Sequence, residues 1–192
     1  MRTWSEREYA DPVPYLRHRA ELVVALGPRL ELGDRLCDLA CGDGGLADFL
    51  PGVDYLGVDA DPQMVAEGLG KGRTVVNADL NEFEPEAPVT ATSIFRAIYY
   101  ARDRRAFLRH VGGYTERKLV FDLNPRQYRV QEVLADLRAA GWPQHALRPF
   151  FVPQTRALPR PVGAALVAAE RSGPLARLAL RFRFTYLVAA WR

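Results

Sequence analysis

Two kinds of hydrophobic pattern alternate along this chain. Short, nearly continuous apolar runs are typical of strands buried in a parallel sheet, and they predict strands at 35–39, 54–59, 74–78, 89–95, 118–123, 146–152 and 182–191. Apolar positions that recur every three to four residues are typical of helices with one buried face, and they predict helices at 15–27, 46–50, 62–69, 103–111, 126–140, 162–170 and 175–180. Because strands and helices alternate, we expect an α/β fold: a doubly wound, mostly parallel sheet with helices on both faces.

The pattern shows no point at which the chain divides. Its 192 residues are enough for one domain with a full core and few for two. We therefore expect a single domain over residues 1–192, with a helical cap at 1–30 and an insertion at 153–181 before the last strand. The insertion is apolar, hinged by prolines and interspersed with arginines. It could cover a hydrophobic substrate, lie against a membrane surface or be a packed connection.

Composition narrows the class of protein. The chain is 48% hydrophobic and 26% charged, as expected of a globular protein in water. No apolar run reaches the roughly 18 residues that a membrane span needs, and the polar start does not resemble a signal peptide, so we expect a cytoplasmic protein. The net charge of +3 comes without a dense basic run, which gives no strong signal for nucleic acid. No metal-ligand cluster is visible, and the oligomeric state is left open.

The candidate chemistry centres on a glycine turn between the strand at 35–39 and the helix at 46–50. The turn reads Asp38-Leu39-Ala40-Cys41-Gly42-Asp43-Gly44. Glycines let the backbone approach a ligand closely, and the N-terminus of the following helix supplies free N–H groups. Asp59 and Asp79 stand at the ends of the next two predicted strands. Ligands of such sheets bind at the carboxyl ends of the strands, so the sequence predicts a nucleotide-type site there.

Two classes of nucleotide ligand fit this turn. Residues 42–47 match the G-x-G-x-x-A pattern of a dinucleotide enzyme, with Asp59 at the distance at which such an enzyme binds a ribose hydroxyl. Asp38 argues against a pyrophosphate, because its negative charge would repel it and would attract an α-amino group. Three acids without a positive partner in the loops suit a cationic ligand with an exocyclic amine. Asp43 is expected to be solvated or to act as a helix N-terminal charge.

Three segments together resemble a known family. Residues 38–44, 56–64 and 77–80 resemble, in order and at the family's spacing, the first three motifs of class I S-adenosylmethionine-dependent methyltransferases. The resemblance spans roughly residues 20–140. It implies a seven-stranded sheet whose last strand is antiparallel, methyltransferase activity, and S-adenosylmethionine as the cofactor.

The same resemblance implies roles for individual residues. Gly42 and Gly44 would approach the methionyl part of the cofactor, Asp38 its amino group, and Asp59 the ribose hydroxyls. Met64 would pack on the adenine, and Asp79 would accept from the adenine amine. An aromatic or arginine on an N-terminal helix can reach the cofactor carboxylate in similar enzymes. The complete set of expected cofactor-binding residues is Asp38, Ala40, Gly42, Gly44, Asp59, Ala60, Met64, Asp79, Leu80, Phe95, Tyr15 and Arg19.

The acceptor side carries less information. Arg96, Tyr99 and Tyr100 follow the predicted strand at 89–95, where the acceptor should enter. They could orient an anionic or aromatic acceptor, or one tyrosine could take a proton; because the tyrosines are adjacent, we expect at most one to face the pocket. The place lacks the Asn/Asp-Pro-Pro-aromatic motif of enzymes that methylate amino groups of nucleic acids.

Several functions stay open on this basis. The leading hypothesis is methyl transfer to an oxygen, nitrogen or carbon of a small molecule, apolar if the insertion at 153–181 covers it. This reaction needs mainly alignment and a dry pocket. The alternatives are an RNA or protein methyltransferase, a non-catalytic protein that binds an adenosyl cofactor, and an NAD(P)-dependent oxidoreductase.

Overall fold

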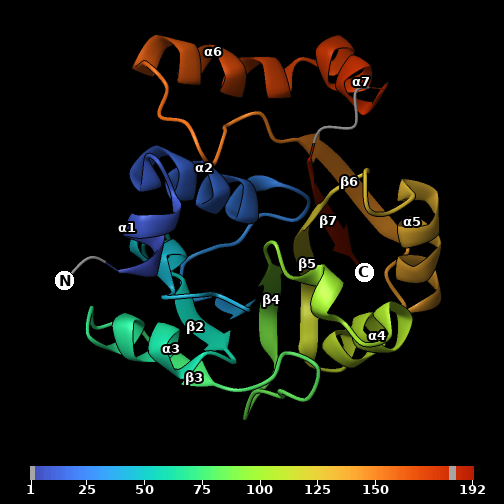
Figure 1. Cartoon of the computed structure of the whole chain (residues 1–192). Helices are drawn as coiled ribbons and strands as arrows, with labels where there is room; N and C mark the ends of the chain where they lie inside the picture. Colours follow the sequence, from blue (N-terminus) through green and yellow to red (C-terminus); the bar gives the residue numbers. More distant parts are fainter. Residues whose placement is uncertain (1–2, 182–184) are drawn as a thin grey trace.

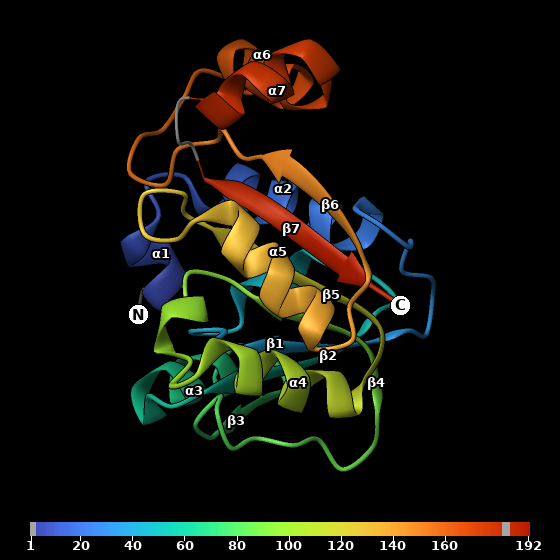
Figure 2. The same ribbon diagram turned by 90° about the vertical axis from the view of Figure 1, so that its right-hand side faces the viewer.

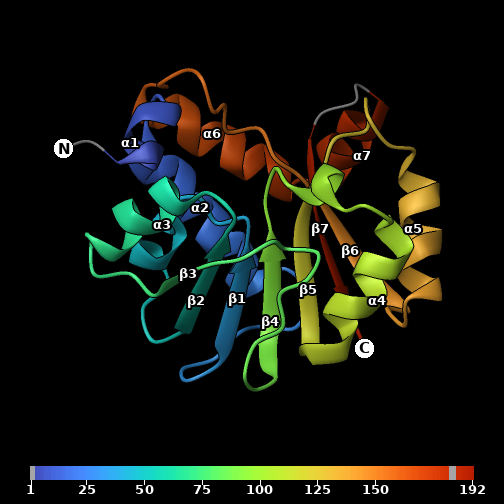
Figure 3. The same ribbon diagram turned by 60° about the horizontal axis from the view of Figure 1, so that its bottom comes forward.

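The structure is a computed structural model that describes residues 3–181 and 185–192. One seven-stranded sheet runs through the molecule (Figure 1). Its strands are β1 (Arg35–Leu39), β2 (Asp54–Asp59), β3 (Val75–Asn77), β4 (Val89–Ile94), β5 (Thr115–Leu123), β6 (Gln144–Pro149) and β7 (Tyr186–Trp191). Figure 3 shows them side by side in the order β3-β2-β1-β4-β5-β7-β6. The first five strands are parallel, and β7 lies antiparallel between β5 and β6.

This sheet confirms the expected fold class. An antiparallel strand inserted before the edge also separates it from the dinucleotide-binding order 3-2-1-4-5-6. The predicted strand 182–191 is found as β7 from Tyr186, and residues 182–184 lie outside the described part of the chain. Strand β6 starts earlier than predicted, at Gln144, and ends at Pro149. Because β6 is an edge strand, the missing N–H of this proline costs no ladder bond.

Helices cover both faces of the sheet. The described helices are α1 (Trp4–Glu8), α2 (Pro12–Ala25), α3 (Pro62–Leu69), α4 (Arg104–Tyr114), α5 (Val130–Ala139), α6 (Arg160–Arg171) and α7 (Gly173–Arg181), with 3₁₀ turns at Gly45–Phe49 and Ile98–Tyr100. Of these, α6 and α7 lie outside the covering layers (Figure 1). Figure 2 shows α4 and α5 on one face and α2 on the other. Each face has its own core, one around Phe107, Phe121 and Leu137, the other around Leu16, Val23 and Leu187. No helix among the described residues is long and apolar enough to cross a membrane.

Besides β6, the main differences from the predictions lie in three helical segments. Helix α1 lies within the helical cap expected at 1–30, but ahead of 15–27, where the only separate helix of this cap is predicted. The segment predicted as a helix at 46–50 is a 3₁₀ turn. Helix α5 begins at Val130 rather than 126, because the side chain of Asn124 accepts from the N–H of Arg126 at 3.0 Å and forms a turn in place of helix.

Candidate functional site

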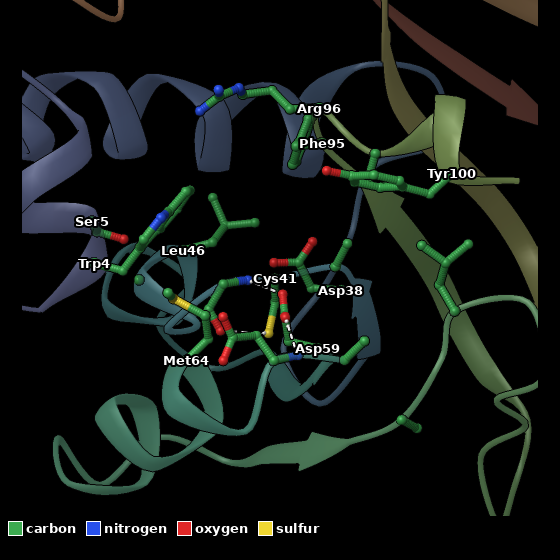
Figure 4. A pocket seen from close by; sticks show the side chains of 18 of the residues that line it. Trp4, Ser5, Asp38, Cys41, Leu46, Asp59, Met64, Phe95, Arg96 and Tyr100 are labelled. Atoms are coloured by element: carbon green, nitrogen blue, oxygen red, sulfur yellow. Dashed lines mark hydrogen bonds between the residues drawn. The ribbon is translucent and has the colours of Figure 1, made fainter.

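The carboxyl ends of β1, β2 and β4 open into a cavity of about 590 Å³, which α1 covers. Figure 4 shows Asp38 and Asp59 at its centre, with Trp4 and Met64 on one side and Phe95 and Tyr100 on the other. The predicted residues that line this cavity are Arg19, Asp38, Ala40, Gly42, Asp59, Ala60, Met64, Asp79, Leu80, Phe95, Arg96, Tyr99 and Tyr100. Hereafter we call it the main cavity.

Two predicted residues do not line the main cavity. Gly44 has a φ of +68°, and a Cβ built on it would lie 3.0 Å from a methyl of Val75, so it turns the chain against the neighbouring strand. Tyr15 is buried and lines an adjoining cavity instead. The roles that the resemblance implies for both residues toward a cofactor remain predictions.

The glycine turn is shaped by its contact with α1. Ala40, Gly42 and Gly44 all have positive φ, and a Cβ on Gly42 would lie 2.8 Å from the ring of Trp4. No residue other than glycine fits there without moving the ring, and its positive φ favours glycine as well. The N–H of Gly42 donates to Oδ2 of Asp59 at 2.7 Å. The turn is therefore tied to the end of β2 on one side and covered by α1 on the other.

Asp38 is a buried carboxylate at the floor of the main cavity. The hydroxyl of Tyr55 donates to its Oδ2 at 2.8 Å, and the hydroxyl of Ser93 to its Oδ1 at 2.6 Å. Burial nevertheless raises the pKa of Asp38 to about 6, because removing the ionised form from water costs more than these bonds return. No ion pair within the described residues neutralises it. A cation that entered the cavity would therefore be attracted to this carboxylate.

Asp59 is only partly buried and keeps capacity for a ligand. Its Oδ2 accepts from Gly42 and its Oδ1 accepts from the N–H of Asp61 at 2.9 Å. Each carboxylate oxygen can accept two hydrogen bonds, so one position on each stays open. Burial raises the pKa of Asp59. Asp61 caps α3 by accepting from Gln63 at 2.8 Å, which fits the Asp-Pro start of that helix.

The expectation of three acids without a positive partner is wrong for Asp79. Arg102 forms an ion pair with Asp79 at 2.7 Å and also lines the main cavity. Bonds from the backbone and side chain of Asn81, together with Arg102, hold the pKa of Asp79 below its usual value. The pair joins a strand end to a loop far along the chain, and strand spacing contains no information about such a contact.

Arg19 brings positive charge to the opposite wall. It is 4% exposed, its guanidinium lies 3.4 Å from Oδ2 of Asp122, and it stacks over the rings of Tyr15 and Phe95 at 4.7 and 4.5 Å. Its Nε has no hydrogen-bond partner among the described residues. Arg19 lines both the main cavity and the adjoining one. A buried donor without a partner suits an anionic group of a ligand at this boundary.

The acceptor-side residues surround the same boundary. Arg96 has a positive φ of 56°, and its N–H donates to Oδ1 of Asp122 at 2.6 Å. Its side chain pairs with Glu8 at 3.3 Å. The rings of Tyr99 and Tyr100 lie 4.4 Å apart and both line the main cavity, contrary to the expectation that at most one would. A 3₁₀ turn rather than a strand carries them, so neighbouring side chains do not point to opposite faces.

A second cavity of about 540 Å³ adjoins the first and shares Arg19, Arg96 and Tyr99 with it. Hereafter it is the adjoining cavity. Tyr15, Phe150 and Phe151 supply aromatic surface, while the polar positions are held by Asp122, Asn124, Gln127 and Gln154. Within the part of the chain described, no group of three or more His, Cys, Asp or Glu side chains could hold a metal ion.

Sequence reasoning missed the residues that α1 contributes. Trp4 and Ser5 line the main cavity, and Ser5 donates through both its N–H and its hydroxyl to Asp43. Tyr9, just after the helix, also lines it and is an N-terminal aromatic of the kind that the resemblance implies. Asp43, expected to be solvated or to act as a helix N-terminal charge, is fully buried and accepts at 3.3 Å from the N–H of Gly45, at the start of the 3₁₀ turn. Burial opposes its ionisation, but the bonds from Ser5 and the charge of Arg73 keep its pKa below the usual value. Thr3 and Glu6 form a capping box, so the Thr-x-x-Glu pattern is the signal that predicts this helix.

Comparison with known proteins finds solved structures with a similar fold. The family profile of the methionine biosynthesis protein MetW matches residues 20–88, from α2 to the start of β4 and less than half of the chain. A structure of the complex between the Haloferax volcanii Trm112 methyltransferase activator and its methyltransferase partner matches with a TM-score of 0.68 at 17% identity, over 98% of this chain and 93% of the other. No curated protein sequence matches the chain.

Two further structures match at similar levels. The magnesium protoporphyrin IX methyltransferase of Synechocystis PCC 6803, solved with bound S-adenosylmethionine, has a TM-score of 0.62 at 15% identity, over 100% of this chain and 85% of the other. An S-adenosylmethionine-dependent methyltransferase of Mesorhizobium loti has a TM-score of 0.61 at 19% identity, over 85% and 94%. The chain thus has the fold of class I S-adenosylmethionine-dependent methyltransferases, which confirms the resemblance.

Proposed function

We propose that this chain is an enzyme that binds S-adenosylmethionine in the main cavity and transfers its methyl group to a small acceptor in the adjoining cavity. The observation that carries the proposal is the joint placement of Asp38, Gly42 and Asp59 around one cavity of about 590 Å³. That volume lies within the usual range for a small-molecule site. The fold and the structural neighbours that hold this cofactor support the same assignment.

The residues present fit this cofactor. Asp59 retains open acceptor positions for two ribose hydroxyls, and Asp38 is a buried carboxylate that an ammonium group would stabilise. Met64 offers an apolar surface to a base, and the unpartnered Nε of Arg19 can donate to a carboxylate. When bound, the cofactor supplies an already activated methyl group, so the protein needs no group to activate it.

The contribution of the chain is alignment and exclusion of water. Helix α1 covers the main cavity, and the aromatic walls of the adjoining cavity favour an acceptor with an apolar or aromatic body. Arg19, Arg96 and Tyr99 stand where the two cavities meet, so they can orient a polar or anionic group of the acceptor toward the methyl donor. Tyr99, which lines both cavities, and Tyr100, which lines the main cavity, carry hydroxyls that can pass on a proton if the acceptor releases one.

Binding of the product analogue tests the cofactor assignment. S-adenosylhomocysteine should bind and raise the melting temperature in a concentration-dependent way, whereas NAD should not. Asp59→Ala should weaken binding about 100-fold, because hydrogen bonds from two hydroxyls to a charged group are lost. Asp54→Ala is the matched control: this aspartate is exposed at the opposite end of the same strand. Stabilisation by NAD alone, or full binding by Asp59→Ala, would contradict the assignment.

The fate of the methyl group tests the acceptor class. With S-adenosylmethionine labelled with tritium in the methyl group and a cell extract, we expect label in the small-molecule filtrate. The Asp59→Ala protein measures the background. Label in precipitated RNA or protein would replace this proposal by an RNA or protein methyltransferase. No transfer above background by a protein that binds S-adenosylhomocysteine would indicate a non-catalytic binding protein.

A further inference from the structure

Helices α6 and α7 form a hairpin that stands outside the layers of the fold. Only Ser172 separates them, and Figure 1 shows α6 beyond α2, on its side away from the sheet, and α7 beyond the end of β6. They contact each other and the edge strand β6. We call residues 160–181 the α6–α7 hairpin. It is not needed to complete the main cavity, whose lining contains none of its residues.

The α6–α7 hairpin exposes large apolar side chains to solvent. Val162 is 45% exposed, and Leu175 and Leu178 are each 48% exposed. On α6, Leu166 and Val167 are only half-buried, although they lie on the side that carries the buried Glu170. Helices that pack only within a domain bury such a stripe. The hairpin therefore has apolar surface that its own domain does not cover.

The charged side chains that the hairpin exposes are positive. Its sequence contains Arg160, Arg171, Arg177 and Arg181, and a single acid, Glu170. Glu170 is 1% exposed and is bound by His18 at 2.6 Å and by the N–H of Phe151 at 2.6 Å. Arg160 and Arg171 are exposed, and neither forms an ion pair with any described residue. The charge that this hairpin presents to solvent is therefore positive.

The groove under the hairpin also combines positive charge with apolar surface. A cavity of about 600 Å³ between α2, β6 and the end of α6 is lined by three arginines, Arg29, Arg148 and Arg171, and by one acid, Glu21. Its apolar wall is formed by Leu22, Leu26 and Phe49. No hydrogen bond or ion pair among the described residues involves the three guanidinium groups. Unpaired cations beside apolar surface match the chemistry of an anionic amphiphile.

We propose that the α6–α7 hairpin docks this protein on the surface of a bilayer that contains anionic lipids. An amphipathic segment with arginines and leucines lies in the interface, with apolar side chains among the acyl chains and cations at the headgroups. The arginine-lined groove receives lipid phosphates. Charge decides against a second copy as the occupant, because two hairpins of the same positive sign repel each other. This proposal is independent of the proposed methyl transfer.

Co-sedimentation with lipid vesicles tests this proposal. The full chain should sediment with vesicles of mixed phosphatidylglycerol and phosphatidylcholine, should not sediment with pure phosphatidylcholine, and should be released by salt. Arg160→Glu/Arg171→Glu should lower partitioning at least tenfold, because each cation near an anionic surface contributes roughly a fivefold factor. Leu175→Ser/Leu178→Ser should also lower it.

The controls place matching changes elsewhere on the surface. Leu32→Ser/Leu69→Ser removes two exposed leucines, and Arg109→Glu/Arg126→Glu reverses two exposed arginines, all outside the hairpin. Circular dichroism confirms that every variant is folded, and either hairpin pair alone suffices if the other does not fold. The proposal is overturned by equal sedimentation with both vesicle types, by no sedimentation, or by hairpin variants that bind like the controls. Dimers that the Leu175→Ser/Leu178→Ser change dissociates, without vesicle binding, would assign this surface to a second copy.

Discussion

Asp38, Asp59 and Asp79 line the main cavity at or near the ends of strands, but their carboxylates differ in electrostatic environment. Burial raises the pKa of Asp38 to about 6 and raises that of Asp59, whereas hydrogen bonds from Asn81 and the charge of Arg102 lower the pKa of Asp79. Asp38 is thus the carboxylate whose ionisation a bound cation would change most near neutral pH. The consequence is a pH-dependent affinity for the ligand.

We expect the affinity for S-adenosylhomocysteine to fall as pH drops below about 6. The raised pKa means that Asp38 is protonated, and neutral, in the ligand-free protein at lower pH. An ammonium group favours the ionised carboxylate, so binding must first remove that proton, and affinity falls by about tenfold per pH unit. The α-amino group of the ligand stays protonated throughout this range. Titration calorimetry at pH 5, 6 and 7 measures the effect.

Asp38→Asn separates this group from its neighbour. The variant should bind weakly at pH 7 and show a flat profile between pH 5 and 7, with the melting temperature confirming that it is folded. A profile that keeps its slope in Asp38→Asn would assign the titration to Asp59, and a flat profile in the wild type would contradict the placement of the ammonium group beside Asp38.

Whether the environment of a site residue can be predicted from the sequence depends on whether local structure or distant contacts determine it. The positions of Asp38 and Asp59 could be predicted, because a strand that ends in an acid places it at the carboxyl edge of the sheet. The partner of Asp79 could not, because Arg102 reaches it from another loop. The burial of Asp43 could not either, because it arises from Ser5 and Arg73, which are distant along the chain.

Helix α1 is held over the main cavity by polar contacts at several points. Ser5 binds Asp43, the N–H of Trp4 donates to Glu67, and Arg7 pairs with Glu67 at 2.9 Å. The ring of Trp4 meets that of Tyr9 edge to face, with centroids 5.6 Å apart, and covers Gly42 of the glycine turn. Because α1 lies over one side of the cavity, we expect its detachment to precede release of a bound ligand.

Ser5→Ala should therefore speed release of S-adenosylhomocysteine about tenfold, and should lower the melting temperature of the ligand-free protein by a few degrees. The variant removes a buried hydrogen bond to a charged group, of about 1.5–3 kcal/mol, from the contact that holds α1 closed. Stopped-flow displacement measures the rate. Lys71→Ala is the control, because it removes only the exposed pair between Lys71 and Glu6 and should change the rate little. Equal rates for Ser5→Ala and the wild type would show that α1 does not limit release.

Helices could be predicted where one face is apolar over several turns, as in α4 around Phe107, Leu108 and Val111. Helix α1 has five residues and one buried side chain, so no hydrophobic period reveals it. Its contacts with the glycine turn and α3 stabilise it instead. The 3₁₀ turn at Gly45–Phe49 is likewise too short for periodicity to distinguish it from an α-helix.

Over the whole molecule, the sheet and the cavity residues that lie in sequence motifs could be predicted from the sequence. The parts of the site that arise from tertiary contacts could not. Alternating strands and helices predict the parallel part of the sheet, while the antiparallel β7 was expected only through the family resemblance. The adjoining cavity combines α2, the 3₁₀ turn at Ile98–Tyr100 and the segment after β6. Because these segments meet only in the folded chain, no single stretch of sequence could predict that cavity.

The two margins of the sheet have a further consequence for how this protein behaves at high concentration. A margin of unpaired N–H and C=O groups invites another chain to add a strand, which is how many sheets aggregate. Here one margin is β3, only three residues long, and the other is β6, which ends in Pro149. A second chain that paired with β3 could form only a few backbone hydrogen bonds. One that paired with β6 would meet Pro149, which has no N–H to donate. The architecture that places the cavities therefore also protects the molecule against edge-to-edge polymerisation.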